Sequence, residues 1–383
     1  MNAPLTFAGV TPDRTVAPAD RAELAAVVRD LYAAGKTFAF AGGGTELELG
    51  NPPRPIDTAV RTTALDRVIE YSPEDQTITV EAGMRIAALD AVLAEHDQLL
   101  PVDVGDRERA TIGGAIATNA LGARRHRYGS IKDLIVGIEF VRPDGVTAHG
   151  GGKVVKNVAG FDLPKLMVGS LGTLGGIASA TFRVFPKPAV TRAVLAQTSP
   201  ASTFFDACMV DRSLEPVAVV HHPAANGIVL TFAGLGASVE QQLAHLATLA
   251  ASHAVALDVL DSVALERFAG AETEIRCGSA WRWTVSTNPV GARASLASPV
   301  ATTAEIGYPT FGVTLVSAAD DVSIDALAAA RGPAIVFHAM PQRARGRIDA
   351  WGETPPSFPL MRALKSNFDP KGLCNPGRFV GGL

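Results

Sequence analysis

Hydrophobic positions in the first half of the chain switch between a helical and a strand period. Apolar residues at 24, 27, 28 and 31 recur at i, i+3, i+4 and i+7, which predicts a helix that begins after Asp20 and ends before Gly35. Asp20 and Glu23 have the spacing of a capping box. Short apolar runs predict strands at 37–41, 77–81 and 177–185, a hairpin at 135–148 and a second helix at 85–96.

From residue 191 onward the predicted elements follow a different order. Strand, helix, two strands and helix come at 194–197, 201–211, 217–221, 228–232 and 239–251, with further strands near 283–285, 312–316 and 334–337. This β-α-β-β-α-β order predicts an α+β domain with a ferredoxin-like antiparallel sheet that helices cover on one face. Because Pro186 and Pro188 interrupt the chain before this region, we predict domains at 1–188 and 189–345, and a turn-rich tail at 346–383 that packs back on the first domain.

Composition narrows the class of protein. The 383 residues are 47% hydrophobic and 19% charged and carry a net charge of −4, so electrostatics gives no reason to expect nucleic acid or an anionic membrane as a partner. No run of 18 apolar residues occurs, and the N-terminus lacks the basic and apolar regions of a signal peptide. We therefore expect a cytoplasmic protein without a membrane span.

The three cysteines, Cys208, Cys277 and Cys374, are scattered along the second half of the chain. Thiols without C-x-x-C spacing favour a reducing compartment over a disulfide framework. Three thiols are also too few for an iron–sulfur cluster, which takes about four thiolate ligands. The histidines of the C-terminal half have no neighbouring acid-Gly-x-His motif, so we expect no metal site.

The segment 110–122 has almost no side-chain bulk and reads Ala-Thr-Ile-Gly-Gly-Ala-Ile-Ala-Thr-Asn-Ala-Leu-Gly. A backbone this bare can approach a flat or phosphorylated ligand and bind it through amides, and the plainer interpretation is a tightly packed strand and turn. Two glycine-rich loops, at 42–45 and 169–176, are phosphate-binding loops or ordinary turns. The first is not a dinucleotide fingerprint, because Leu47 stands where G-x-G-x-x-G needs its last glycine.

Six segments in order resemble the FAD-binding domain of the vanillyl-alcohol oxidase/p-cresol methylhydroxylase (PCMH) family. The likeness spans residues 15–188, and the tail motif Asn375-Pro376-Gly377 fits it as well. The resemblance implies an α+β fold: a PCMH-type FAD-binding domain of two α+β subdomains, followed here by the ferredoxin-like domain. The six segments are residues 42–45, 100–103, 110–122, 127–129, 156–163 and 169–177.

The resemblance also implies, position by position, which residues bind FAD. The first loop would hold the pyrophosphate, the bare segment would line the flavin and its diphosphate, the last loop would contact the adenine end, and Asn375 would return near the isoalloxazine ring. Because only His96 precedes position 120 and no cysteine precedes Cys208, we expect the FAD to be non-covalent. The cofactor-binding residues predicted in this way are Ala41, Gly42, Gly43, Gly44, Thr45, Glu46, Pro101, Asp103, Thr111, Ile112, Gly113, Gly114, Thr118, Asn119, Gly122, Tyr128, Gly129, Gly175, Gly176, Ile177 and Asn375.

Within the family, the chain is most similar to the smaller FAD-binding subunits of bacterial glycolate oxidases. The likeness lies in its length, segment 156–163, the run Trp281-Arg282-Trp283 and the short tail. It implies a complex with a larger FAD-containing subunit and with an iron–sulfur subunit that accepts the electrons. It also implies a small 2-hydroxy acid substrate such as glycolate, and it leaves open an association of the complex with the inner face of the membrane.

Oxidation of a 2-hydroxy acid needs a cation for the carboxylate and a base for the hydroxyl. Arg282 is the candidate cation and His338 the candidate base. Arg282 is equally interpreted as a stacked structural arginine, and His338, after the apolar run 335–337, as a histidine at the edge of the core. Three functions stay open: an FAD subunit of a glycolate-type oxidase complex, a stand-alone FAD-dependent D-2-hydroxyacid dehydrogenase, and a structural flavin subunit without turnover.

Overall fold

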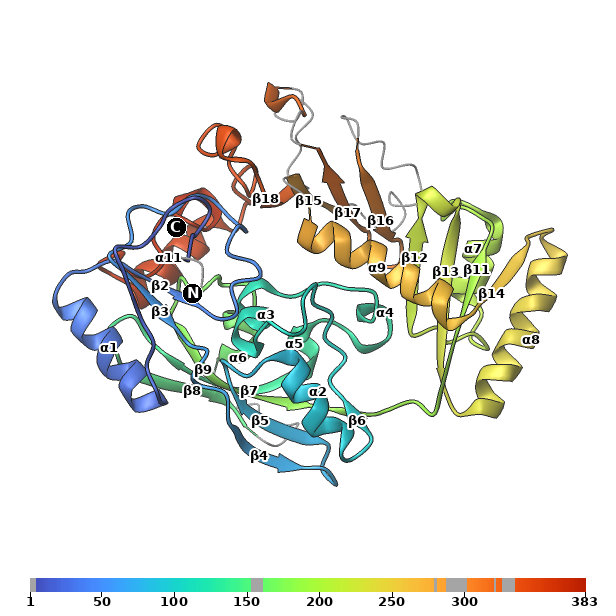
Figure 1. The fold of residues 1–383 in the computed structure, drawn as a ribbon, viewed down its shortest axis with the longest axis horizontal. Helices are drawn as coiled ribbons and strands as arrows, with labels where there is room; N and C mark the ends of the chain where they lie inside the picture. Colours follow the sequence, from blue (N-terminus) through green and yellow to red (C-terminus); the bar gives the residue numbers. More distant parts are fainter. Residues whose placement is uncertain (1–4, 153–160, 279–280, 287–301, 320–321, 326–334) are drawn as a thin grey trace. The chain divides into compact units, whose positions relative to one another are not determined.

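The computed structural model describes residues 5–152, 161–278, 281–286, 302–319, 322–325 and 335–383 (Figure 1). The chain divides into two compact units, each with helices packed on sheets. The α+β class predicted from the sequence is confirmed. The first unit comprises Met1–Ala120, Ser130–Phe185 and Val336–Leu383, and the second comprises Leu121–Gly129 and Pro186–Ile335.

The first unit is built on two main sheets. Leu24 and Val28 of helix α1 (Arg21–Ala33) share one buried core with Phe38 from the smaller sheet and Ala178 from the larger. The smaller sheet is parallel, in the order β1 (Arg14–Val16), β3 (Thr58–Arg61), β2 (Phe38–Ala41). The larger is antiparallel, in the order β4 (Val68–Ser72), β5 (Thr77–Glu81), β9 (Gly176–Arg183), β7 (Ile135–Val141), β8 (Thr147–Gly151).

Shorter elements complete this unit. Strands β6 (Gln98–Leu99) and β10 (Phe185–Pro186) pair with each other. The helices are α2 (Ile86–Ala94), α3 (Ile112–Thr118), α5 (Ile131–Leu134), α6 (Leu163–Met167) and α11 (Phe358–Phe368).

Helix α1 begins and ends where the sequence predicts. Asp20 accepts a hydrogen bond from Glu23 N at 2.8 Å, and the Glu23 carboxylate accepts one from Ala19 N at 2.7 Å. Gly35, just past the last turn, has φ +66°, a conformation that favours glycine. The predicted helix over this stretch is therefore confirmed, and its capping residues are the ones that the sequence indicated.

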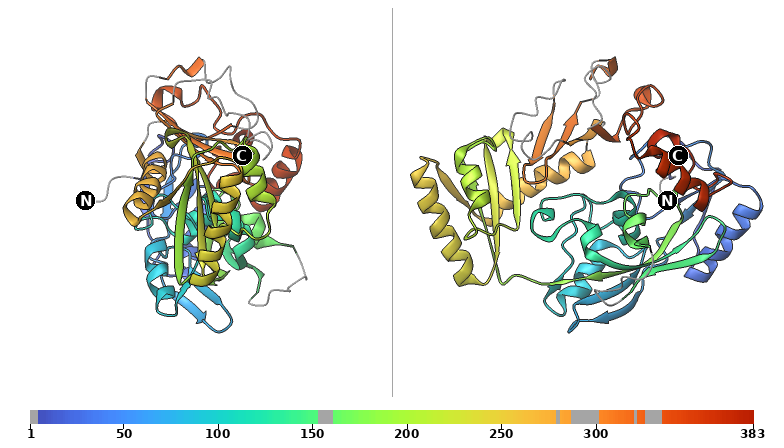
Figure 2. Two further views of the ribbon diagram at one scale, coloured as in Figure 1. Left: turned by 90° about the vertical axis from the view of Figure 1, so that its right-hand side faces the viewer. Right: turned by 180° about the vertical axis from the view of Figure 1, so that it is seen from behind.

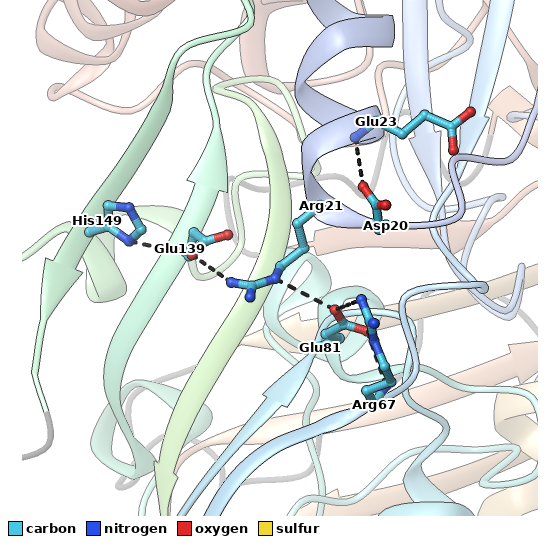
Figure 3. A network of polar contacts seen from close by, with 7 residues as sticks. All are labelled: Asp20, Arg21, Glu23, Arg67, Glu81, Glu139 and His149. Atoms are coloured by element: carbon cyan, nitrogen blue, oxygen red, sulfur yellow. Dashed lines mark hydrogen bonds and ion pairs between the residues drawn. The ribbon is translucent and has the colours of Figure 1, made fainter.

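A row of charged residues crosses the larger sheet beneath the start of α1, as Figure 3 shows. Glu81 on β5 and Glu139 on β7 both lie opposite Ser179 of β9, so they face the same side of the sheet. Arg21 bridges them, at 3.5 Å from Glu81 Oε1 and 2.8 Å from Glu139 Oε2. Arg67 adds a second cation to Glu81 at 3.0 Å. Since Glu81 is only 1% exposed, these two arginines offset the cost of burying its charge.

The second unit contains the predicted β-α-β-β-α-β arrangement. Its strands lie in the order β14 (Leu257–Leu260), β11 (Val190–Ala196), β13 (Gly227–Gly234), β12 (Ala218–His222). Helices α7 (Thr203–Val210) and α8 (Gly236–Ser252) bury Phe204, Phe205 and Leu246 against one face of these strands. The ferredoxin-like sheet expected from the element order is confirmed.

The expectation that helices cover this sheet on one face is wrong. A further helix, α9 (Ser262–Gly278), packs Leu265 and Phe268 on Leu195 and Val229, which point away from the α7/α8 core. The view at the left of Figure 2 shows α9 and α8 on opposite sides of the strands. Within this unit the sheet continues past β12 through β16 (Ala304–Tyr308), β17 (Val313–Ala318) and β15 (Trp281–Ser286).

The two units differ from the predicted domains at three places, the first of which is residues 186–188, which group with the second unit. Residues Leu121–Gly129, which include helix α4 (Arg125–Tyr128), group with the second unit. Leu121 packs there against the core cluster that contains Tyr308, and the Arg125 guanidinium lies 5.6 Å from the centroid of the Phe311 ring. Residues 336–345 group with the first unit, as does the tail. None of the described helices is long and apolar enough to cross a bilayer.

Candidate cofactor site

The first glycine loop leaves β2 and packs directly against the residues that precede α3. A Cβ on Gly42 would lie 2.1 Å from Thr111 Oγ1, and one on Gly43 would lie 1.5 Å from Arg109 O. Contacts this short leave no room for a side chain at either position. Gly44, next in the loop, has φ +78°. The glycines of this loop therefore allow two backbone segments to touch.

The bare segment 110–122 forms a helix through most of its length, so its plainer interpretation as a strand and turn is wrong. Helix α3 begins after Thr111, whose hydroxyl accepts a hydrogen bond from Gly114 N at 3.3 Å. It ends at Asn119, which has φ +53°. The alternation of apolar and small residues is typical of a strand. Here, however, the threonine N-cap marks the start of a helix of two turns and the left-handed asparagine marks its end.

The glycines at the start of α3 differ in what surrounds them. The amides of Ile112 and Gly113 donate to Met84 O and Ala82 O, and a Cβ on Gly113 would lie 2.9 Å from the Ala82 side chain. A Cβ on Gly114 would meet a single atom within 4 Å outside the helix backbone, the capping hydroxyl of Thr111 at 3.2 Å. Gly113 is thus a packing glycine, and Gly114 faces open space.

The loop 169–176 closes the other end of α3. Gly169 N and Leu171 N donate at 2.9 Å to the last helix carbonyls, Ile116 O and Ala117 O. Leu171 has φ +49°, which is uncommon for a residue with a branched side chain. The loop is therefore held in one conformation by hydrogen bonds to α3.

The C-terminal tail reaches this loop from the other side. Asn375 N donates to Phe38 O at 2.6 Å, and its side-chain amide donates to Leu171 O. The Cys374 thiol donates to Gly172 O at 3.1 Å, and burial raises the pKa of that thiol to about 12. A neutral thiol is thus the form that lies against the loop.

A buried lysine holds the tail in place. Lys365 on α11 donates to Thr173 O, Cys374 O and Asp369 Oδ2, at 2.8, 2.7 and 2.7 Å. Asp369 is completely buried and also accepts hydrogen bonds from Leu373 N and Cys374 N. All three donors of the ammonium group have partners, so its charge is fully compensated.

Three buried polar atoms around these segments have no hydrogen-bond partner among the described residues. They are Asn119 Oδ1 at the end of α3, Ser170 Oγ in the loop and Asn375 Oδ1 in the tail. Their neighbours are hydrogen-bonded to one another through Gly169, Leu171 and the Asn375 amide. Buried polar atoms are rarely left unsatisfied, so a bound group is expected to supply their partners.

The predicted cofactor residues as a whole are divided between the two units. Residues 41–46, 101, 103, 111–114, 118, 119, 175–177 and 375 belong to the first unit. Gly175 and Gly176 have a packing role, since a Cβ on them would lie 2.5 Å from Val141 O and 2.4 Å from the Phe40 ring. The three others, Gly122, Tyr128 and Gly129, belong to the second unit. Of the motif 156–163, residues 156–160 lie outside the described residues.

The two catalytic candidates also fall in different units. Arg282 on β15 is 6% exposed and belongs to the second unit, between the buried Trp281 and Trp283. His338 on β18 (Ile335–Ala339) is half-buried and belongs to the first.

In α4, burial and the neighbouring Arg127 lower the pKa of His126, so this histidine is neutral at pH 7.

Sequence reasoning missed several residues of this region. Ser170, Lys365 and Asp369 were not among the predicted site residues, although the i, i+4 spacing of Lys365 and Asp369 was a signal for an ion pair at a helix end. Ser170 lies in a loop that the sequence did indicate, and only its burial distinguishes it from its neighbours.

Residues 12–151 match the sequence model of a family described as an FAD binding domain. Among curated proteins, the chain is 34% identical over 178 residues to a D-2-hydroxyglutarate dehydrogenase of Xanthomonas citri, 33% over 187 to glycolate oxidase subunit GlcD of Bacillus subtilis, and 37% over 122 to glycolate oxidase subunit GlcE of Escherichia coli. These matches cover 46%, 48% and 32% of this chain and 38%, 39% and 35% of the relatives, so the chain spans less than half the length of each.

Two solved structures of alkyldihydroxyacetonephosphate synthase have the same fold. They superpose on this chain with TM-scores of 0.66 and 0.65, at 17% and 16% sequence identity. The aligned parts cover 94% of this chain and 75% and 76% of the two solved chains. At that identity the likeness concerns the fold alone. Residues 12–151 of this chain therefore form an FAD-binding domain within a PCMH-type α+β fold, and FAD is the cofactor of this domain.

Proposed function

We propose that this chain is the FAD-binding subunit of a complex that oxidises a small 2-hydroxy acid such as glycolate. The observation that carries the proposal is the match of residues 12–151 to the FAD binding domain, together with relatives named as glycolate oxidase subunits and 2-hydroxy acid dehydrogenases. The partners would be a larger FAD-containing subunit and an iron–sulfur subunit.

The residues present fit FAD in two distinct ways. The glycine loop 42–44 and the open face at Gly114 leave room for a ligand to approach the backbone without a side chain between them. The carbonyl oxygens of Asn119 and Asn375 can only accept hydrogen bonds, so they suit the donors of the cofactor, its sugar hydroxyls and the N–H of its flavin ring. The Ser170 hydroxyl can either donate or accept a hydrogen bond.

When bound, FAD supplies the two-electron acceptor for the oxidation. The chain's own contribution is to hold it without a covalent bond: the backbone near 41–46 and 111–114 would face the pyrophosphate, and Asn119, Ser170 and Asn375 the flavin half. Lys365 fixes the tail that carries Asn375. The substrate site itself is assigned to the sister flavoprotein, so Arg282 and His338 are candidates for carboxylate binding and proton transfer only if this chain oxidises the substrate by itself.

The test is an anaerobic titration with glycolate and D-lactate, followed by the flavin absorbance. The tagged chain is isolated once alone and once with the subunits that copurify from its native host. The proposal predicts that the flavin of this chain bleaches in the complex and stays oxidised when the chain is alone. A flavin that stays oxidised in a substrate-reduced complex would refute it in favour of a structural role.

A second candidate is a stand-alone dehydrogenase. It is favoured by the likeness to a D-lactate dehydrogenase of Archaeoglobus fulgidus, 33% identical over 208 residues, 53% of this chain and 46% of that protein. This candidate predicts bleaching of the isolated chain by substrate. The same titration therefore separates all three functions.

A further inference from the structure

Two buried arginines, neither of them among the residues assigned to FAD, lie side by side in the first unit. Arg345 follows the turn 342–344, and its side chain is 8% exposed. Arg378 lies just before the last turn of the tail, Val380–Gly382, and is 3% exposed. Burial lowers the pKa of Arg378 to about 10, and the positive charge of Arg345 contributes to this shift, so the two charges are close enough to repel each other.

The partners of the two guanidinium groups are few. Arg345 Nη2 pairs with Glu48, whose side chain is 39% exposed. Arg378 Nη2 donates to Leu47 O at 2.7 Å and to Leu49 O, and its guanidinium carbon lies 5.4 Å from the centroid of the Phe7 ring. Both arginines are thus fixed against the segment 47–49, which continues the first glycine loop.

The charges around this pair do not balance. Glu48 is the one carboxylate that pairs with either arginine among the described residues. Asp349, the next acid along the chain from Arg345, is engaged by the Asn51 amide at 3.1 Å and by Trp351 N at 2.8 Å. Two buried cations facing one half-exposed carboxylate leave a net positive charge out of water, which is costly in a protein interior.

Three buried N–H groups of the pair have no partner among the described residues: Arg345 Nε, Arg345 Nη1 and Arg378 Nε. A guanidinium presents its donors in a planar fork that matches the oxygens of a carboxylate or phosphate. We propose that Arg345 and Arg378 form a binding site for an oxyanion, a carboxylate or a phosphate group, beside the loop 46–50. The anion supplies both the missing charge and the missing acceptors.

The oxyanion has two sources, the pyrophosphate of bound FAD or a separate small anion such as a 2-hydroxy acid. The site itself is inferred from burial and unpaired donors and does not depend on the proposed function. A comparison of holoprotein and FAD-free protein distinguishes the two sources, because a site filled by FAD is closed to added phosphate in the holoprotein.

The experiment measures the Tm and binding heat of both forms at pH 7 and constant ionic strength, in chloride, inorganic phosphate and glycolate. In wild type we expect phosphate or glycolate to raise the Tm above its value in chloride. In Arg345→Met that rise is lost and binding weakens by about tenfold or more, while the Tm in chloride is no lower than in wild type, since an uncompensated charge has been removed. Arg343→Met, an exposed neighbour, keeps the wild-type response.

If the response occurs in the FAD-free protein alone and Arg345→Met also weakens FAD binding, the anion is the pyrophosphate of the cofactor. If the holoprotein responds and FAD affinity is unchanged, the anion is a separate ligand. Arg345→Lys keeps the charge but loses the planar fork of donors. This variant should still fold, and it should bind the anion more weakly than wild type. The proposal is overturned by a wild-type Tm that is the same in all three salts in both forms, or by an Arg345→Met protein that responds like wild type.

Discussion

The C-terminal segment 345–383 carries two sets of buried cations that differ in how their donors are satisfied. Lys365 has three donors and three partners, and its charge is paired with the fully buried Asp369. Arg345 and Arg378 have between them three buried nitrogens without a partner among the described residues, and their one carboxylate partner there, the partly exposed Glu48, pairs with Arg345. Both sets are tied to the loops predicted to bind FAD or to their continuation, the first to Thr173 in the loop 169–176 and the second to segment 47–49, which follows the first glycine loop.

The difference separates a structural cation from a binding one. A buried charge whose partners are complete stabilises the fold and has nothing left to offer a ligand. A buried charge with unpaired donors is costly by itself, and a ligand can remove that cost. We therefore expect the Lys365 site to respond to mutation in the same way with and without ligand, and the arginine site to respond according to what is bound.

The largest effect is expected for Lys365→Met. It leaves the buried Asp369 without its counter-charge, so the free energy of unfolding should fall by about 3–5 kcal/mol in holoprotein and FAD-free protein alike. Urea unfolding of both forms measures this. Lys371→Met is the matched control, because Lys371 is an exposed tail lysine that donates to Tyr32 O, and it should cost little. Equal effects of the two substitutions would contradict the structural role of Lys365.

Arg378→Met should have an intermediate effect. It leaves the buried carbonyl of Leu49 without its donor, at a cost of about 1–3 kcal/mol, and removes one of the two donors of Leu47 O, which keeps Ala8 N, whereas Arg345→Met removes no backbone partner. In the same urea experiment in chloride, the free energy of unfolding of Arg378→Met should therefore be lower than that of Arg345→Met. The reverse ranking would show that Arg345 stabilises the fold through its pair with Glu48.

Cys374 allows a test of the tail by pH. Its pKa is raised in the folded protein from about 9 to about 12, so the folded state keeps a proton that the unfolded state releases. This contribution to stability is complete below pH 9 and is lost as the pH rises toward 12. We expect Cys374→Ala to flatten the decline in Tm above pH 9, with wild type as the reference. A parallel decline in both proteins would show that the thiol does not titrate in this way.

The smallest effect on stability is expected for Gly114→Ala. Alanine favours the helix by about 1 kcal/mol, which offsets its contact with Thr111, so the unfolding of the FAD-free protein should change little. FAD affinity should nevertheless fall by about tenfold, because the new methyl group occupies the open face that we assign to the cofactor. Gly113→Ala, one residue earlier, should instead destabilise the FAD-free protein through its clash with Ala82. Unchanged FAD affinity in Gly114→Ala would remove this position from the site.

Local periodicity was sufficient for much of the fold. The helix after Asp20, the strand 77–81 and the order of elements from 191 to 260 follow from patterns within ten to twenty residues. The bare segment 110–122 was read correctly as unusual, but its helix depends on Thr111 and Asn119 as caps and on the carbonyls of Ala82 and Met84.

The missed parts of the site depend on contacts between distant segments. Lys365 bonds to Thr173, 192 positions away, and Arg345 pairs with Glu48, 297 positions away. No local pattern distinguishes these cations from solvated ones, because their significance lies in burial. Helix α9 was missed for a similar reason: its inward residues Leu265, Phe268 and Ile275 form too narrow a stripe to stand out from a polar sequence.

The central claim, that this chain binds FAD without a covalent bond, is tested most directly by the absorbance spectrum of the purified protein before and after acid precipitation. The account predicts a yellow protein with one FAD per chain, all of it released into the supernatant. A folded but colourless protein, or flavin that stays with the precipitate, would contradict it.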